Sequence, residues 1–205
     1  YRIWIVVKRY RKFPKYSVWA ELLSRLPSII FSIFILKYFG QDILGHYGLS
    51  LMVLSLPSAL ISVSISEAFI PRAAMAKHDN KHSELLEKLY FRLVSIMVLP
   101  FIMLGLFSRN LFPFVFGQEW MLAGVITQIL IFRIFFEIIF SPVLSLVDIM
   151  EKQELHIIRN VISVIIASIS LMLGIYYKDF YLTFWCLALM EGASISIMGG
   201  YMMHL

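Results

Sequence analysis

A charged side chain inside a long apolar stretch of the sequence is expensive and usually serves a function, and six such residues are candidates here. Three are near the middle of such a stretch, and three lie closer to one end. The three near the middle are Arg133, Glu137 and Glu191, and the three closer to one end are Glu21, Arg25 and Glu67. Arginine can donate two parallel hydrogen bonds to a phosphate, and a glutamate in an apolar setting can hold a proton or a cation. These residue types predict that charged ligands are bound and moved.

The spacing of the central residues leaves two interpretations open. Arg133 and Glu137 are four residues apart, so they share one face of a helix and can pair. In the first interpretation they form an ion pair between helices that needs no further partner. In the second, Arg133 binds an anion, and Glu137 pairs with Arg133 when no anion is bound. Glu191 has no partner in its own stretch, so it is protonated, paired with another helix or exposed to water. It is therefore either a packing residue or a candidate for coupling to protons or cations.

The three charges nearer the ends are candidates for a gate. Glu21 and Arg25 have the favourable order and spacing for a helical pair, and Glu67 reaches the same depth from the next stretch. The simpler alternative is that all three side chains extend to the membrane surface. We expect no catalytic residue, metal site or resident cofactor, because the sequence lacks a phosphate-binding glycine loop, a zinc-protease histidine pair and a nucleophile elbow.

The composition predicts which elements hold these charges. The 205 residues are 60% hydrophobic and 15% charged, with a mean hydropathy of +0.82. Soluble domains are typically about 45–50% apolar and about 25% charged, so a soluble globule and a disordered chain are both excluded. A single cysteine, Cys186, excludes an internal disulfide framework. We expect a multi-pass protein of the lipid bilayer, whose net charge of +5 reflects contact with the membrane surface rather than with nucleic acid.

Six apolar stretches are long enough to span a membrane as helices, which predicts an all-α bundle over residues 19–205. The predicted spans are about 19–38, 47–70, 91–107, 121–147, 157–177 and 180–203. The third is short and is expected to extend at either end. Residues 1–18 are predicted to be a basic cytoplasmic linker on the membrane surface.

The distribution of lysine and arginine predicts the orientation of the spans. Thirteen lie before the first span, between the second and third, and between the fourth and fifth, whereas three lie in the alternate loops. Positive residues favour the cytoplasmic side, so both ends of this segment are expected to face the cytoplasm.

Short motifs in the loops carry a resemblance to a known family. They are FPKYS at 13–17, FG at 39–40, GHY at 45–47, LSLP at 54–57, SISEAFIPRA at 64–73, FGQEW at 116–120, AG at 123–124 and SP at 141–142, followed by Asp148 and Gln153. In this order they resemble the C-terminal half of bacterial oligosaccharide flippases, the O-antigen and capsule translocases of the multidrug/oligosaccharidyl-lipid/polysaccharide exporter superfamily. Many relatives carry an arginine where this chain has Met52 and a glutamine where it has Glu67.

The resemblance implies one six-helix bundle of a two-bundle transporter in the bacterial cytoplasmic (inner) membrane, with an N-terminal half preceding this segment. Such a carrier moves undecaprenyl-diphosphate-linked oligosaccharide across the membrane by alternating access. Proton or sodium coupling is known in the superfamily. The polysaccharide polymerase and chain-length machinery are candidate partners. On this interpretation Arg133 and Arg25 contact the headgroup, while Glu137, Glu191, Glu67 and Glu21 serve coupling or gating.

Three alternatives remain at the level of sequence. A related exporter of small cationic drugs would use the acidic residues in its cavity. A membrane enzyme of glycan assembly, such as a polymerase or ligase, usually has long outer loops, which this chain lacks. A non-transporting scaffold would leave the mid-span charges without a purpose.

Overall fold

The computed structural model describes residues 12–64, 82–149 and 154–203, and these ranges are helical apart from short connections. The α-helices are α2 (Lys12–Phe39), α3 (Gln41–Ser64), α5 (His82–Phe116), α6 (Met121–Ile149), α7 (Glu154–Tyr177) and α8 (Phe180–Met203), with a 3₁₀ turn, η2 (Gln118–Trp120), before α6. The described part of the chain contains no strand, so the predicted all-α class is confirmed there.

Four helices in the described ranges are long and apolar enough to cross a membrane. Their apolar segments are Val98–Phe116, Gln118–Phe140, Ile157–Tyr177 and Phe180–Tyr201. The chain is therefore a multi-pass membrane protein. The predicted span 19–38 falls on α2, and residues 47–64 of the predicted span 47–70 fall on α3, while residues 65–70 lie outside the described residues. Neither helix is among these four, so the count of six spans stays a prediction.

Several helices extend beyond the predicted spans. The third predicted span, 91–107, is the middle of a 35-residue helix, α5, as its short length suggested. Helix α2 begins at Lys12, so residues 12–18 of the predicted linker form its first turns. Helix α3 begins at Gln41 rather than at residue 47, and Asp42 in its first turn favours that start because a negative charge stabilises a helix N-terminus.

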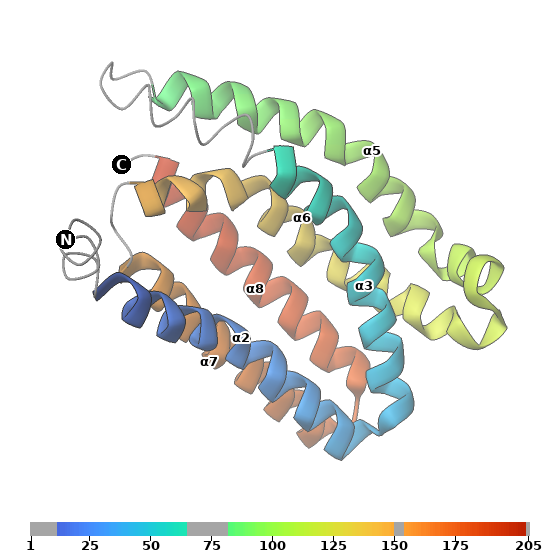
Figure 1. Cartoon of the computed structure of the whole chain (residues 1–205). Helices are drawn as coiled ribbons and strands as arrows, with labels where there is room; N and C mark the ends of the chain where they lie inside the picture. The colour runs from blue at the N-terminus through green and yellow to red at the C-terminus, as the bar shows by residue number, and fades with distance from the viewer. Residues whose placement is uncertain (1–11, 65–81, 150–153, 204–205) are drawn as a thin grey trace, which may run out of the picture.

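Five helices form a closed ring, and the sixth described helix packs outside it. Helix α6 contacts α3 and α8, α7 contacts α8 and α2, and α2 contacts α3, while α5 packs mainly on α6. Figure 1 shows α5 along the outer edge of the bundle and α8 between α6 and the α2–α7 pair. The core of the ring includes stacked and tilted rings of Phe31, Tyr47 and Phe184, with centroids 5.4–6.0 Å apart.

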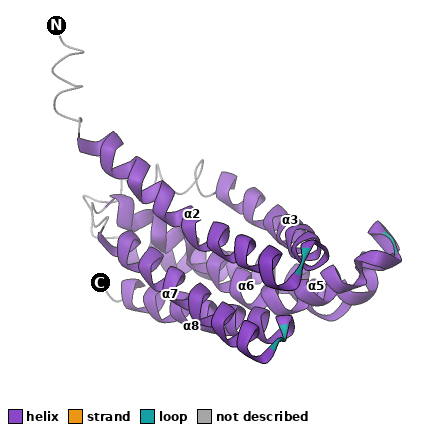
Figure 2. Ribbon diagram, turned by 90° about the horizontal axis from the view of Figure 1, so that it is seen from below, coloured by secondary structure: helices purple, strands orange, loops and turns teal. Residues whose placement is uncertain are grey.

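The helices alternate in direction, with short connections at one end of the bundle. These connections are Gly40, the segment 117–120 and the pair Lys178-Asp179. Figure 2 shows all three loops at the end away from the C-terminus. Gly40 has a φ of 91°, and its N–H bonds to the carbonyl of Ile35, a left-handed cap that stops α2. Asp179 accepts hydrogen bonds from the N–H groups of Tyr181 (2.8 Å) and Leu182 (3.4 Å), which starts α8.

All three predicted cytoplasmic regions join helix ends at the opposite end of the bundle (Figure 1), which we call the basic end. It comprises the starts of α2, α5 and α7 and the ends of α3, α6 and α8. The antiparallel order agrees with the order expected from the positive residues, and assignment of the basic end to the cytoplasm remains a prediction.

Candidate functional site

A cluster of four charged side chains and one serine joins helices α6, α7 and α8. On α6, Arg133 Nη2 lies 3.6 Å from Glu137 Oε2, which confirms that these two residues pair along one helix face. Arg133 Nε also contacts Glu191 Oε2 of α8. Arg159 Nη2 of α7 lies 3.6 Å from Glu137 Oε1. The result is a chain of alternating charge from Glu191 through Arg133 and Glu137 to Arg159.

Glu191 is paired with other helices, which is one of the three possibilities left open by the sequence. Besides Arg133 it contacts Ser163 of α7, whose hydroxyl donates a 2.5 Å hydrogen bond to Oε1. One carboxylate thus joins α8 to both α6 and α7. Because a buried carboxylate is costly unless it is paired and hydrogen-bonded, these two partners explain how Glu191 can lie in the core.

Glu191 is the least exposed member of the cluster, and Glu137 and Arg159 are the most exposed. The exposed fraction of the side chain is 6% for Glu191, 21% for Arg133, 28% for Arg159 and 36% for Glu137. Arg159 lies five residues after the start of α7, which is at the basic end. The Glu191 end of the cluster is therefore closed, whereas Glu137 and Arg159 form an open edge.

Two small cavities adjoin the cluster, and both are lined by Arg133 and Glu191. One also contains Arg159, Ser163 and Ser194 in its wall, with a volume of about 30 Å³. The other, also about 30 Å³, is lined in addition by Phe31 and Tyr47 of the aromatic core. Each is large enough for a water molecule but too small for a sugar. A large headgroup would therefore contact this cluster only through its open edge.

The structure does not bring the remaining predicted site residues into a described contact with the cluster. Arg25 is exposed on α2 and lines neither of the two small cavities. Glu21 lies on α2, but its side chain is outside the described part of the structure. Glu67 also lies outside the described residues. Their predicted gating and headgroup roles remain predictions.

Arg159 and Ser163 are site residues that the sequence analysis missed. Arg159 was counted with the basic residues of a junction, although it lies inside the predicted span 157–177. Ser163 follows it by four residues, which places both on one face of α7. That spacing was the signal available in the sequence. Within the described residues, no group of three or more His, Cys, Asp or Glu side chains could hold a metal.

Comparison with known families assigns the chain to a class of proteins. The family model described as polysaccharide biosynthesis protein matches residues 3–125, more than half of the chain. The chain belongs to the polysaccharide biosynthesis protein family. This match confirms, at the level of the family, the resemblance carried by the loop motifs. Comparison with curated proteins and with solved structures gave no significant match.

The family match covers α2, α3, α5 and the first residues of α6, and it ends before Arg133. The charged cluster therefore lies outside the matched region. Membership of the polysaccharide biosynthesis protein family indicates a role in polysaccharide synthesis or export.

Proposed function

We propose that this polysaccharide biosynthesis protein is a flippase that moves polyprenyl-diphosphate-linked oligosaccharide across the bacterial cytoplasmic membrane by alternating access. The observation that carries the proposal is the charged cluster inside a membrane bundle. A diphosphate headgroup is polar and multiply anionic, so it crosses hydrocarbon unaided only at a prohibitive cost. Arg133 and Arg159 offer donors that can replace its water, and both are bound to the same carboxylate, Glu137.

The pairing of the acidic residues favours an anionic substrate over a cationic drug. A cation exporter needs a carboxylate that is free to bind its substrate. Glu137 contacts two arginines, and Glu191 contacts Arg133 and Ser163. If a ligand displaced Glu137, two guanidinium groups would become available, which suits phosphate.

A carrier also fits the connections better than an enzyme of glycan assembly does. The three described connections at the end opposite the basic end contain one to four residues. They leave no room there for a catalytic loop. We therefore propose that the protein acts as a non-enzymatic carrier with no resident cofactor, coupled to protons or sodium ions, and that the polymerase and chain-length machinery receive its product.

The direct test is the sidedness of the lipid-linked oligosaccharide in cells that lack the gene. We expect the intermediate to accumulate on the cytoplasmic leaflet, and the full-length wild-type protein to reverse this. A variant carrying Arg133→Met together with Glu191→Leu should fold but fail to restore transport, because it has lost one of the two phosphate donors. Arg109→Gln, which removes an exposed charge from α5, is the matched control. Normal export in the deletion strain, where no redundant carrier is present, would refute the proposal.

A further inference from the structure

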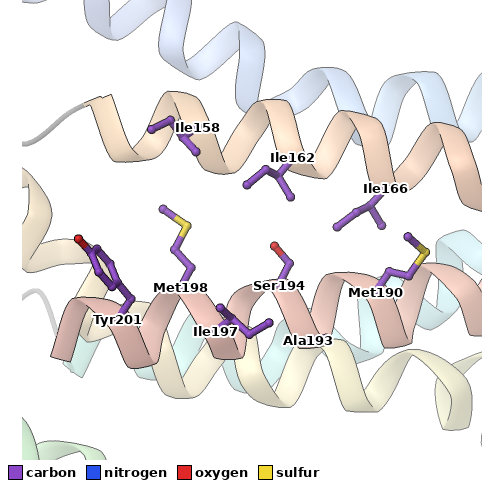
Figure 3. A pocket seen from close by; sticks show the side chains of 9 residues that line it. All are labelled: Ile158, Ile162, Ile166, Met190, Ala193, Ser194, Ile197, Met198 and Tyr201. Carbon is purple, nitrogen blue, oxygen red and sulfur yellow. The ribbon is translucent and has the colours of Figure 1, made fainter. Parts of the chain in front are cut away.

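A groove runs between α7 and α8 directly beside the charged cluster. It has a volume of about 600 Å³, and its wall is formed mostly by isoleucine and methionine side chains. In Figure 3, Ile162 and Ile166 of α7 face Ser194 and Met198 of α8 across the opening. Side chains of the described helices line this groove, but none of them fills it. A long apolar chain is the chemistry that fits such a wall.

The groove and the charged cavity meet at two residues. Ile166 and Ser194 line both of them. At the basic end of α7, Ile158 lines the groove and the next residue, Arg159, lines the charged cavity. Apolar and cationic surfaces are therefore adjacent along the same seam. A ligand with an apolar chain and an anionic head could contact both at once.

The length of the groove fits one leaflet. Its lining on α8 runs from Met190 to Tyr201, which is about 16 Å at a helical rise of about 1.5 Å per residue. The hydrocarbon core of a bilayer is about 30 Å thick, so the groove spans about half of it. Since α7 begins and α8 ends at the basic end, the groove lies in the half of the bundle nearer that end.

We propose that this groove binds the polyprenyl chain of the lipid-linked substrate in the leaflet nearer the basic end, while Arg159 contacts the diphosphate. The proposal rests on the flippase function proposed above and names where the substrate enters. Charge complementarity selects this occupant over an ordinary phospholipid, because a diphosphate can accept hydrogen bonds from Arg133 and Arg159 together. The ligand's phosphate takes the place of the Glu137 carboxylate, which lies at the open edge of the cluster.

Binding of polyprenyl diphosphate to the purified full-length protein tests both halves of the site. We expect Arg159→Gln to weaken that binding about tenfold or more, since charge-assisted hydrogen bonds are lost, and to leave the binding of uncharged polyprenol unchanged. Ala193→Phe fills the groove and should weaken the binding of both lipids about tenfold, because each methylene kept out of an apolar site costs about fourfold in affinity. Leu106→Phe, at an exposed position of α5 that does not line the groove, is the matched control.

A second groove variant protects the test against misfolding. Ile197 lines the groove but is 75% exposed, so Ile197→Trp adds bulk without disturbing the core. Wild-type affinity for polyprenyl diphosphate in both groove variants would overturn the proposal. Equal competition by phosphatidylglycerol, or by inorganic diphosphate alone, would also overturn it.

The outcome can be separated from that of the proposed function. If the wild-type gene restores correct sidedness and the groove variants bind and flip normally, the groove inference fails while the flippase function stands. If the wild-type protein binds polyprenyl diphosphate through the groove, but cells that lack the gene accumulate no lipid-linked oligosaccharide on the cytoplasmic leaflet, the flippase function fails instead.

Discussion

The contact between Arg133 and Glu191 makes a quantitative prediction about stability. In Glu191→Leu, the Arg133 guanidinium keeps only its 3.6 Å contact with Glu137. Breaking a fully buried ion pair by removing one partner costs about 3–5 kcal/mol. Glu191 is almost fully buried, but Arg133 is one-fifth exposed and keeps one carboxylate nearby. We therefore expect a loss of about 2–3 kcal/mol in the free energy of unfolding.

The double variant Arg133→Met with Glu191→Leu should recover most of this loss. It removes both charges and replaces them with apolar side chains of similar volume, a change that is often neutral or stabilising. Methionine is suited to the position because its flexible side chain fills irregular gaps. Ser163 loses its carboxylate acceptor, but a helical serine can bond instead to a carbonyl of the preceding turn.

The assay is a double-mutant cycle on the full-length protein in detergent, with unfolding followed by heat or by denaturing detergent. Arg133→Met should also cost about 2–3 kcal/mol, because it leaves the nearly buried Glu191 carboxylate without its cation. If the double variant loses less than about 1 kcal/mol, the coupling energy between the two sites is about 3–5 kcal/mol. If the double variant instead loses the sum of the two single effects, the residues do not interact in the folded protein. The contact between Arg133 and Glu191, and the proposed anion site that includes it, would then be wrong.

Three further predictions test other parts of the structure. Glu137→Gln should change stability by less than about 1 kcal/mol, because Glu137 is partly exposed, yet it should alter the dependence of transport on the ion gradient; unchanged dependence argues against coupling there. Gly124→Ala should cost about 1–3 kcal/mol, because a Cβ there would overlap the backbone carbonyl oxygen of Ser108 on α5. Gly105→Ala has room for its Cβ and should be neutral or slightly stabilising, so equal melting temperatures of the two variants would contradict this packing. In a cysteine-free background, Lys178→Cys should react with a membrane-impermeant thiol reagent in intact cells, and Lys88→Cys only after permeabilisation; the reverse pattern would invert the orientation.

The sequence predicted the helices better than it predicted their ends. Hydropathy detects the part of a helix that contacts lipid, whereas caps and packing determine where the helix begins and ends. The predicted segment 180–203 coincides with α8 because Asp179 caps that helix at the edge of its apolar stretch. Helix α5 extends beyond 91–107 at both ends. Its first turns are polar, so an apolar stretch does not include them, whereas residues 108–116 belong to the apolar segment Val98–Phe116, which the prediction ended too early.

The site shows the same division between local and non-local information. The pairing of Arg133 with Glu137 follows from a separation of four residues on one helix, so the sequence was sufficient. The partner of Glu191 depends on which helices are neighbours in the ring, and nothing local specifies that α8 packs on both α6 and α7. The sequence did not reveal Arg159 as a site residue, because an arginine near the end of a span is expected to mark the cytoplasmic side of the membrane.

The neutrality of the cluster bears on how transport could be coupled to an ion. Arg133 and Arg159 are balanced by Glu137 and Glu191, so an anion can enter only if a carboxylate leaves or takes up a cation. Glu137 is the residue suited to leave, because it is the most exposed and both of its ion-pair contacts are 3.6 Å long. Once separated from two guanidinium groups, its carboxylate can bind a sodium ion, since the nearby positive charges no longer repel that cation. Binding of an anionic substrate and binding of a cation would then favour each other, which is the linkage that a coupled carrier requires.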